Sequence, residues 1–437
     1  MVKICVLGLG YIGLPTALLF ANSGHEVVGV DIKHQMVETL KTGKMPFEEN
    51  GFQELLTSAL EKKAFRAESQ VEESDVFLVA VPTPFDPEMR MADLKYVISA
   101  CEMIVPLLRK GNLVIIESTI PPKTCDKQVK QTLEKSTFRM CEDFYVSHCP
   151  ERAIPGNTLH EMVYNDRVIG GVDEKSTQLT AELYSSFVKG NLHLTTSTTA
   201  EMIKLMENTF RDVNIALANE FAQIADDYGI DIWKAIEIAN QHPRVNILKP
   251  GPGVGGHCIA IDPWFLTENA SNSSLIMMAR QINDSMPQYV LKMVKEVLAG
   301  IKNPTITVFG AAYKGDIADT RATPAKKFIK LAEKEGFRVK VYDPFVRGWC
   351  YPVLELNEAV DGSDCIVVLT DHSEFRNMDP TGFRNKMFHL NVIDTRNIIN
   401  LSVWQNSDFY VHTIGKKLLK LPHVKDLEKS DILPIVY

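Results

Sequence analysis

The first 31 residues alternate short apolar runs with a glycine turn and a helical stretch. Ile4–Leu7 is a short apolar run, and residues 8–13 follow with glycines at the first, third and sixth positions. A helical pattern from Pro15 to Ser23 then leads to a second apolar run, which ends at Asp31. Strand, glycine turn, helix, strand and acid, in this order, predict a βαβ unit of the kind that binds dinucleotides.

Further along the chain, the pattern changes from strand-like runs to long helices. Apolar runs at 76–81 and 113–116 predict that a parallel sheet continues to about residue 195. Residues 200–228 contain neither Gly nor Pro and are rich in Ala, Glu, Leu, Met and Ile. They predict a single helix of about 28 residues, roughly 40 Å long. A second helical region is expected at about 275–298.

The last third of the chain repeats the N-terminal pattern. An apolar run at 306–310 is followed by a helical stretch at 324–334, and segment 336–343 echoes segment 24–31, with the acid seven residues after the glycine in both. The repeat predicts a second Rossmann-like domain. The expected fold class is therefore α/β, with two doubly wound domains joined by a long central helix and a helical dimerisation region.

The second copy differs from the first in its opening loop. It lacks the Gly-x-Gly-x-x-Gly pattern, so we expect no second NAD site there. Lys314 and Arg321 lie in this loop instead. Two cations at the start of a Rossmann-like domain favour another phosphate-bearing ligand.

Composition narrows the class of protein. The chain has 437 residues and a formal net charge of −8, so we expect two or three domains and disfavour a nucleic-acid-binding role. Eight cysteines without Cys-x-x-Cys spacing favour a reducing compartment, and we expect a cytoplasmic protein. We find neither a signal peptide nor an apolar run of about 18 residues, so no membrane span is expected.

The glycine turn and the strand ends supply candidate contacts to NAD. Asp31 can accept hydrogen bonds from ribose hydroxyls and would repel a 2′-phosphate, which favours NAD over NADP. Thr83 and Thr119 follow two other predicted strands, and doubly wound sheets bind their ligands beyond the carboxyl ends of strands. The candidate cofactor contacts are Gly8, Gly10, Tyr11, Ile12, Gly13, Asp31, Thr83 and Thr119.

Residues 250–263, with the sequence PGPGVGGHCIAIDP, are the most informative stretch. Four glycines within six residues make a loop whose backbone can pack closely against a ligand. Cys258 lies beside this loop, with His257 before it and Asp262 four residues later, and is a candidate nucleophile. A buried apolar cysteine is the plainer alternative. The three side chains could also ligate a metal ion, but no further ligand cluster supports that interpretation and no metal is predicted.

Three polar residues of the long predicted helix share one face. Lys204, Asn208 and Arg211 lie at positions i, i+4 and i+7. Their neighbours on the helix are apolar. The stripe is either an ordinary solvated face or the border of a buried site, and the pattern alone leaves both interpretations open.

Taken together, these features resemble the family of UDP-glucose/UDP-mannose-type sugar-nucleotide 6-dehydrogenases over nearly the full chain. The ordered matches are GLGYIGLP with Asp31, VPTP, ESTIPP, PER at 150–152, AEMIKLMENTFRDVNIALANE, PGPGVGGHCIAID and YKGDIADTR. The resemblance implies an N-terminal NAD-binding domain (1–197), a central helical dimerisation region (198–300) and a C-terminal UDP-sugar-binding domain (301–437). It also implies a homodimer or a higher homo-oligomer.

The resemblance implies roles for the residues that match the family's motifs. Cys258 matches the catalytic thiol, and Lys204 and Asn208 match the pair that stabilises an oxyanion, with Lys204 also a candidate proton shuttle. Glu151 and Asp262 match the carboxylates linked to thioester hydrolysis.

Further residues match binding roles in the family. Thr119 matches a threonine that places water, and Arg321 resembles a cofactor contact. The substrate contacts that the resemblance implies are Arg152, Ala153, Lys204, Asn208, Arg211, His242, Arg244, Gly255, Tyr313, Lys314 and Arg396.

Residues near the thiol bear on the sugar. His257 and Ile261 stand where the glucose branch usually has Ser and Lys, and segment 241–247 resembles the UDP-N-acetylmannosamine dehydrogenases. In that branch His242 and Arg244 would reach the substrate, either within one chain or across a subunit interface. UDP-N-acetylglucosamine and UDP-N-acetylgalactosamine dehydrogenases share much of this pattern and stay alternatives, followed by UDP-glucose dehydrogenases.

The resemblance thus implies an NAD-dependent, four-electron oxidation of UDP-N-acetyl-D-mannosamine to its uronate through a thiohemiacetal and a thioester on Cys258. Two other classes share the N-terminal unit. A two-electron hydroxy-acid oxidoreductase would release one NADH per substrate, whereas the four-electron reaction releases two. A non-catalytic NAD-binding scaffold would release none.

Overall fold

The computed structural model describes residues 1–47, 49–153 and 156–416. The last part of the predicted C-terminal domain (301–437), residues 417–437, lies outside the described residues. Each predicted Rossmann-like domain is present as a doubly wound sheet with helices, which confirms the expected fold class. The exact domain boundaries stay a prediction.

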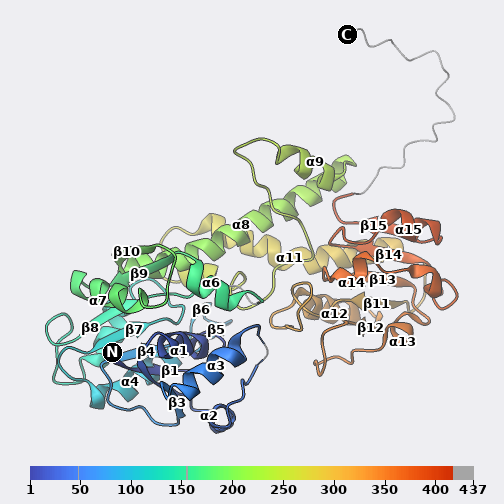
Figure 1. Cartoon of the computed structure of the whole chain (residues 1–437). Helices are drawn as coiled ribbons and strands as arrows, with labels where there is room; N and C mark the ends of the chain where they lie inside the picture. The colour runs from blue at the N-terminus through green and yellow to red at the C-terminus, as the bar shows by residue number, and fades with distance from the viewer. Residues whose placement is uncertain (48, 154–155, 417–437) are drawn as a thin grey trace. The chain divides into compact units, whose positions relative to one another are not determined.

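The chain forms two compact units. The first comprises residues 1–207 with 264–272, and the second comprises residues 208–263 with the chain from Ser273 onward. The boundary falls inside α8 (Ser197–Tyr228), a continuous helix of 32 residues (Figure 1) that confirms the long central helix expected from the sequence. Among the described residues, no helix is both long and apolar enough to cross a membrane.

An eight-stranded sheet organises the described part of the first unit. Its order is β10-β9-β8-β7-β4-β1-β2-β3, and the run from β3 to β8 has the order of a dinucleotide-binding sheet. The order reverses between β1 and β4, where doubly wound sheets bind their ligands. The strands are β1 (Lys3–Leu7), β2 (Glu26–Val30), β3 (Phe65–Glu68), β4 (Val76–Val79), β7 (Leu113–Ile116), β8 (Tyr145–His148), β9 (Arg167–Gly171) and β10 (Leu192–Thr196).

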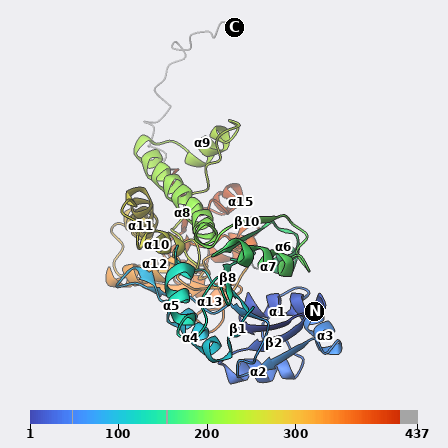
Figure 2. The same ribbon diagram turned by 90° about the vertical axis from the view of Figure 1, so that its left-hand side faces the viewer.

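Helices cover both faces of this sheet. They are α1 (Gly13–Asn22), α2 (His34–Lys41), α3 (Phe52–Glu61), α4 (Lys95–Ile104), α5 (Lys130–Leu133), α6 (Thr158–Tyr164) and α7 (Glu174–Tyr184), and β5 (Phe85–Asp86) and β6 (Met91–Ala92) form a separate hairpin. Ile4 and Val6 pack with residues of α1 and α3, whereas Cys5 and Leu7 pack with residues of α4 and α5. In Figure 2, α4 and α5 lie on the other side of β1 from α1 and α3. Both faces of β1 are therefore buried, as in other parallel sheets.

Two edge strands differ from the parallel sheet that the sequence predicts. β9 runs antiparallel to β8, with Ser147 opposite Gly171 and His148 opposite Gly170, and β10 is parallel to β9. Parallel neighbours need a long crossover, whereas an antiparallel pair does not. In its described part, the connection from β8 to β9 carries one helix, the seven-residue α6. The prediction of a parallel sheet to about residue 195 was thus wrong for the β8–β9 pair.

The second unit contains a five-stranded, wholly parallel sheet in its described part, with the order β12-β11-β13-β14-β15. This sheet confirms the second Rossmann-like domain. Its strands are β11 (Thr305–Phe309), β12 (Arg338–Tyr342), β13 (Cys365–Val368), β14 (Asn391–Asp394) and β15 (Tyr410–Thr413). The helices of this unit are α9 (Ile232–Ala239), α11 (Ser274–Val297), α12 (Pro324–Lys334), α13 (Leu356–Val360), α14 (Ser373–Arg376) and α15 (Leu401–Asn406), and α10 (Asp262–Thr267) begins in it.

A buried chain of polar side chains joins α8 to α11 in the second unit. Arg280 Nη1 donates to Asp212 Oδ1 over 2.5 Å, and Asn283 Nδ2 donates to the same oxygen over 2.8 Å. Asn219 Nδ2 donates to Asn283 Oδ1 over 2.9 Å, and its own oxygen accepts the N–H of Gly251 over 2.8 Å. The two helices therefore fix the point at which the glycine loop begins.

A buried arginine holds two carboxylates in the first unit. Arg167, on β9, donates from Nη2 to Glu151 Oε2 over 2.5 Å, and its Nη1 lies 3.5 Å from Glu117 Oε1. Tyr184 donates its hydroxyl to Glu117 over 3.0 Å. The side chains of Arg167 and Glu117 are 4% and 0% exposed. Burial raises the pKa of Glu117 to about 7, although Arg167 opposes the shift.

We expect Arg167→Met to lower the free energy of unfolding by about 3–5 kcal/mol, because two carboxylates would stay buried without their cation. The control is Arg66→Ala, since Arg66 pairs with Glu26 and Glu72 at the surface and is 41% exposed. That change should cost at most about 1 kcal/mol. Urea unfolding of both variants measures the difference, and equal losses would contradict the buried network.

Candidate functional site

The glycine turn between β1 and α1 has the shape of a pyrophosphate cradle. Gly8 has a φ of +97°, and a Cβ there would lie 2.5 Å from the carbonyl oxygen of Ala80. A Cβ at Gly13 would lie 2.0 Å from the oxygen of Gly8, whereas one at Gly10 would meet nothing within 4 Å. The N-cap of α1, Ile12, provides no side-chain cap. The helix N-terminus can therefore receive an anion beside Gly10.

Asp31 is positioned for the ribose of the same ligand. Its Oδ2 accepts the N–H of Leu9 over 2.9 Å, and its Oδ1 accepts the N–H of Lys33 over 2.8 Å. These bonds hold the half-buried carboxylate against the glycine turn. Each oxygen keeps a lone pair for a ribose hydroxyl, so the residues present fit NAD.

Tyr11 belongs to the turn, but its side chain is already engaged. Its hydroxyl donates to Glu49 and lies 3.0 Å from Thr158 Oγ1. Burial, reinforced by Glu49, raises the pKa of Tyr11 to about 12. Only its backbone is therefore left as a cofactor contact.

The loops after β4 and β7 bring Thr83 and Thr119 to the same edge of the sheet. Ser118 links the two loops, because its N–H donates to Val79 O over 3.2 Å and its hydroxyl to Val81 O over 2.7 Å. The hydroxyl oxygen of Thr83 is buried and has no hydrogen-bond partner among the described residues. Ser118 lies within the ESTIPP match, but the sequence pattern alone does not mark it as the residue that links the two loops.

Glu151 is held by three donors. Its Oε1 accepts the N–H groups of Arg152 and Ala153 over 2.7 and 2.9 Å, and its Oε2 accepts from Arg167. Arg152 in turn pairs with Glu207 on α8 over 2.7 Å. Arg167 is not predictable as a site residue from the sequence, because a cation at the start of an apolar run is indistinguishable from a solvated strand end.

Lys204 is half-buried on α8 and belongs to the first unit. Its positive charge acts on His148, a wholly buried residue at the end of β8. Burial first, and Lys204 to a smaller extent, lower the pKa of His148 to about 3. This imidazole is therefore neutral near neutral pH and does not repel Lys204.

In the second unit, the glycine loop packs directly against the C-terminal Rossmann-like domain. A Cβ at Gly255 would lie 2.7 Å from Tyr313 Cβ and 2.8 Å from Ala322 O. Gly256 has a φ of +84°, and a Cβ there would lie 3.0 Å from the Tyr313 ring. The N–H of Gly256 donates to Arg321 O over 3.0 Å. Glycine is thus required where the loop meets Tyr313, a predicted substrate contact.

Cys258 is exposed at the turn that follows this loop. Its carbonyl oxygen accepts the N–H groups of Ile261 and Asp262 over 3.0 and 2.8 Å, and this turn leads into α10. Asp262 is buried and accepts a 2.5 Å hydrogen bond from Asn208, whose own oxygen accepts from Arg211. The structure therefore brings Cys258, Asp262, Asn208 and Arg211 together, and the polar stripe of α8 borders this site rather than forming a wholly solvated face.

Arg321 is engaged with Asp319. Its Nε and Nη2 donate to the Asp319 carboxylate over 2.6 to 2.9 Å, which raises the pKa of Arg321. Burial and the nearby Arg321 lower the pKa of His257. No group of three or more His, Cys, Asp or Glu side chains in the described part of the chain is arranged to hold a metal ion.

A cavity of about 410 Å³ adjoins Arg396 in the second unit. Its charged lining is mainly basic: Lys234, Lys249, Arg376, Arg396 and Lys416 against Asp231, Glu237 and Asp371. Lys416 pairs with Asp231 and Lys234 with Glu237. Arg396 donates from Nε to Leu369 O over 3.1 Å, and burial lowers its pKa. The remaining excess of positive charge favours an anionic ligand.

The other predicted substrate contacts are exposed in the single chain. Lys314 is exposed on the loop after β11. His242 and Arg244 are also exposed, and the N–H of Arg244 lies 3.4 Å from His242 Nδ1. Among the described residues of the second unit, we observe no contact between Cys258 and either His242 or Arg244.

Comparison with known proteins agrees with this geometry. Residues 2–188, 198–285 and 307–401 match the NAD binding, central and UDP binding domains of the UDP-glucose/GDP-mannose dehydrogenase family. A Methanococcus maripaludis protein named UDP-N-acetyl-D-mannosamine dehydrogenase is 49% identical over 94% of this chain and 97% of its own length. A Ralstonia nicotianae protein named NDP-N-acetyl-D-galactosaminuronic acid dehydrogenase is 41% identical over 90% of this chain and 95% of its own.

A solved structure gives the same result. The UDP-D-ManNAc dehydrogenase of Pyrococcus horikoshii superposes with a TM-score of 0.90 at 44% identity, covering 95% of this chain and 100% of that one. Matches to all three consecutive domains, together with relatives this similar along nearly the whole sequence, confirm the resemblance drawn from the motifs. The chain belongs to the UDP-glucose/GDP-mannose dehydrogenase family and is an NAD-dependent oxidoreductase.

Proposed function

We propose that this protein oxidises the primary alcohol of UDP-N-acetyl-D-mannosamine to the carboxylate, with two NAD per turnover and Cys258 as the nucleophile. The observation that carries the proposal is the exposed Cys258 beside the buried Asn208–Asp262 pair, in a family of nucleotide-sugar dehydrogenases. The sequence identity of 49% with a UDP-N-acetyl-D-mannosamine dehydrogenase supports the choice of sugar.

The chemistry of the thiol follows from this assignment. The glycine turn and Asp31 would hold NAD, which would supply the hydride acceptor for each of the two oxidations. The Cys258 thiolate attacks the aldehyde produced by the first oxidation, and the thiohemiacetal is oxidised to a thioester, which water hydrolyses. Lys204 and Asn208 stabilise the negative charge on the former aldehyde oxygen. Covalent capture keeps a reactive aldehyde from escaping between the two oxidations.

The two carboxylates have different roles in this proposal. Three donors already satisfy Glu151, two of them backbone N–H groups and one the buried Arg167. We assign Glu151 to shaping the segment that includes Arg152 and Ala153. Asp262, four residues after the thiol, is the base that activates the hydrolytic water, and Thr119 orients that water.

Cations of the second unit bind the nucleotide diphosphate. Arg396 borders the basic cavity, and Lys314 is exposed on the first loop of the same domain. Lys and Arg side chains hold phosphate oxygens through charge-assisted hydrogen bonds. Tyr313 and Gly255, which pack together, form the adjoining wall of the substrate site. Arg321 contacts the cofactor from the same loop, and Arg152 and Arg211 flank the sugar.

The thiol chemistry also bears on location. All eight cysteines lie among the described residues, and they form no disulfide. Only a reduced thiol can act as the nucleophile, and exposed thiols persist in reducing compartments. A cytoplasmic location is therefore part of the proposal.

One assay tests the function as a whole. We expect about two NADH released per molecule of UDP-N-acetyl-D-mannosamine consumed, since a carboxylate forms by two successive oxidations. A panel with UDP-N-acetylglucosamine, UDP-N-acetylgalactosamine and UDP-glucose identifies the preferred sugar. The 41% identity to an N-acetylgalactosaminuronic acid dehydrogenase makes the galactosamine the second candidate. A ratio of one would indicate a simple alcohol dehydrogenase, and no NADH from any sugar would indicate a non-catalytic scaffold.

Replacing the thiol should block turnover after the oxidations. We expect Cys258→Ser to accumulate an enzyme-bound ester, because an oxygen ester hydrolyses slowly here. The steady-state rate of NADH release should fall roughly 10²-fold or more relative to the parent. Mass spectrometry of the intact protein detects the adduct. Cys350→Ser, at another exposed cysteine, is the control and should keep full activity. Full activity of Cys258→Ser would refute the nucleophile assignment.

The protein acts as a homodimer in this proposal, with α8 at the interface. Exposed apolar side chains form one stripe along the helix at a helical period: Met202, Met206, Phe210, Leu217, Ile224 and Tyr228. Phe210 is 62% and Tyr228 73% exposed. Contiguous exposed apolar surface of this kind marks an interaction site. A second copy of the chain, with the same stripe, would cover it and could bring His242 and Arg244 of one subunit to the substrate of the other.

The stripe can be tested directly. We expect the parent protein to sediment as a dimer and Phe210→Glu to shift it towards the monomer, since a buried unpaired charge costs several kcal/mol. Phe388→Glu is the control, because Phe388 is 71% exposed and lies away from α8 in the sequence. Analytical ultracentrifugation measures both. A monomeric parent, or a variant that stays fully dimeric, would contradict this interface.

A further inference from the structure

The two Rossmann-like domains use the acid at the end of the second strand differently. Asp31 follows β2 and accepts two backbone N–H groups, which leaves lone pairs for a ligand. Asp343 follows β12 at the corresponding place and is 1% exposed. Its Oδ1 accepts the N–H groups of Phe345 and Val346, both over 2.9 Å. The carboxylate of Asp343 is thus turned into the protein.

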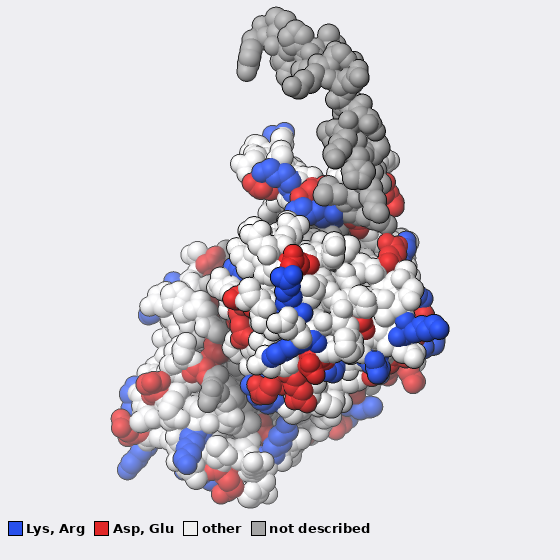
Figure 3. Space-filling view, turned by 90° about the vertical axis from the view of Figure 1, so that its right-hand side faces the viewer, with Lys and Arg blue, Asp and Glu red and all other residues white. Residues whose placement is uncertain are grey.

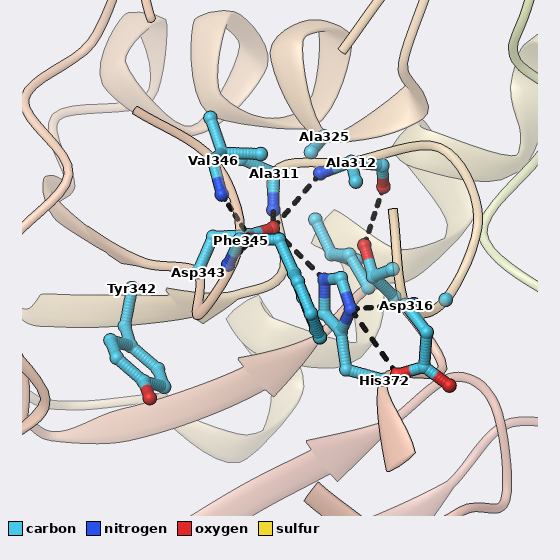
Figure 4. Close-up of polar contacts among 12 residues, drawn as sticks. Ala311, Ala312, Asp316, Ala325, Tyr342, Asp343, Phe345, Val346 and His372 are labelled. Carbon is cyan, nitrogen blue, oxygen red and sulfur yellow. Dashed lines mark hydrogen bonds and ion pairs between the residues drawn. The ribbon is translucent and has the colours of Figure 1, made fainter. Parts of the chain in front are cut away.

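The other oxygen of Asp343 is also occupied from within. Oδ2 accepts the N–H groups of Ala311 and Ala312 over 2.7 and 3.1 Å, and His372 Nε2 lies 3.0 Å away (Figure 4). Burial alone would raise the pKa of Asp343, but the hydrogen bonds from His372 and from the backbone lower it to about 2. Asp343 is therefore a permanent anion that anchors the start of the loop after β11.

His372 connects this anchor to the far end of the same loop. Its Nδ1 accepts the N–H of Asp316 over 2.9 Å (Figure 4). A backbone N–H can only donate, so Nδ1 carries the lone pair and Nε2 carries the hydrogen that is donated to Asp343. The imidazole is fully buried between Phe345, at a ring distance of 5.1 Å, and Phe375, at 5.2 Å. It has no freedom to turn away from either partner.

Loop 310–316 is held by further contacts to the segment that carries His372. Thr370 donates its hydroxyl to Ala312 O over 2.5 Å, and the N–H of Gly315 donates to Asp371 over 3.1 Å. Asp316 has a φ of +60°, a conformation that costs a non-glycine residue energy. Its carboxylate accepts the N–H of Ser373 over 2.8 Å. These contacts hold loop 310–316 against segment 370–373, and the loop in turn sets the positions of Tyr313 and Lys314.

We propose that His372 is a positioning residue for nucleotide binding, which fixes loop 310–316 so that Tyr313 meets the glycine loop before Cys258 and Lys314 faces the diphosphate. The inference rests on the substrate site proposed above. His372 is 0% exposed and cannot touch the substrate, so it acts through the loop. The acid that would bind ribose in a dinucleotide domain serves here as the anchor of this device.

Two substitutions separate the two hydrogen bonds of His372. The oxygen of Asn can replace Nδ1 and accept from Asp316, whereas the longer Gln replaces Nε2 and donates to Asp343. We expect His372→Gln to raise the KM for the UDP-sugar roughly 5- to 10-fold, the worth of about one hydrogen bond. His372→Asn should keep a KM within about 2-fold of the parent. The KM for NAD should rise less than the KM for the UDP-sugar in both variants, because the glycine turn and Asp31 belong to the first unit and only Arg321 lies near the altered loop.

Controls keep this test independent of folding and of the proposed function. His389→Asn, at a half-exposed histidine that pairs with Asp364 in the same domain, should leave both KM values unchanged. Thr370→Val removes another bond to the loop and should raise the KM for the sugar nucleotide in the same direction, which tests the device even if His372→Gln does not fold. Calorimetric titration with UDP alone should show a weaker affinity for UDP in His372→Gln and in Thr370→Val, in line with the rise in their KM for the UDP-sugar.

The outcomes are distinct. Equal effects of Gln and Asn at His372, or equal rises in both KM values, would overturn the positioning role while the parent enzyme still oxidises the UDP-sugar. A parent that neither binds UDP nor releases NADH from any UDP-sugar would instead overturn the proposed function on which this role rests.

Discussion

The loop with Cys258 starts where buried polar side chains between α8 and α11 place it, and the rest of the candidate site depends on that constraint. Asp212 on α8 receives hydrogen bonds from Arg280 and Asn283 on α11, and Asn219 passes the contact on to the N–H of Gly251. Buried polar groups are costly unless each finds a partner, so this chain selects one arrangement of the two helices. The position of Gly251, where the glycine loop begins, therefore depends on how the two helices pack.

Close backbone packing continues the same constraint to the thiol. Gly255 and Gly256 meet Tyr313 at distances that leave no room for a side chain. The turn after Cys258 then places Asp262 under Asn208. A nucleophile on such a loop is held by contacts on both sides and keeps its own side chain exposed. That combination suits the mechanism that we propose, in which Cys258 holds a covalent intermediate through a second oxidation.

The duplicated Rossmann-like architecture shows how one fold can serve two ligands. In the first domain, the glycine turn, an uncapped helix start and a partly satisfied Asp31 leave space and lone pairs for a dinucleotide. In the second domain, the carboxylate of Asp343 accepts hydrogen bonds from five donors within the protein. One of these donors, His372, also accepts the N–H of Asp316 in the loop that carries Tyr313 and Lys314. The acid at the same position of the fold keeps lone pairs free for a ligand in one domain and is fully hydrogen-bonded within the protein in the other.

The sequence by itself determined the two Rossmann-like domains, the long central helix, the NAD fingerprint and the candidate nucleophile. These depend on local patterns, namely the period of apolar residues, the spacing of glycines and the acid after the second strand. Only the tertiary structure decided the antiparallel β8–β9 pair and the partners of Arg167 and His372. Each of these depends on contacts between residues far apart in the chain, for which a single sequence carries no local signal. Arg167 and His372 look like surface residues in the sequence, and burial among distant carboxylates and loops gives them their roles.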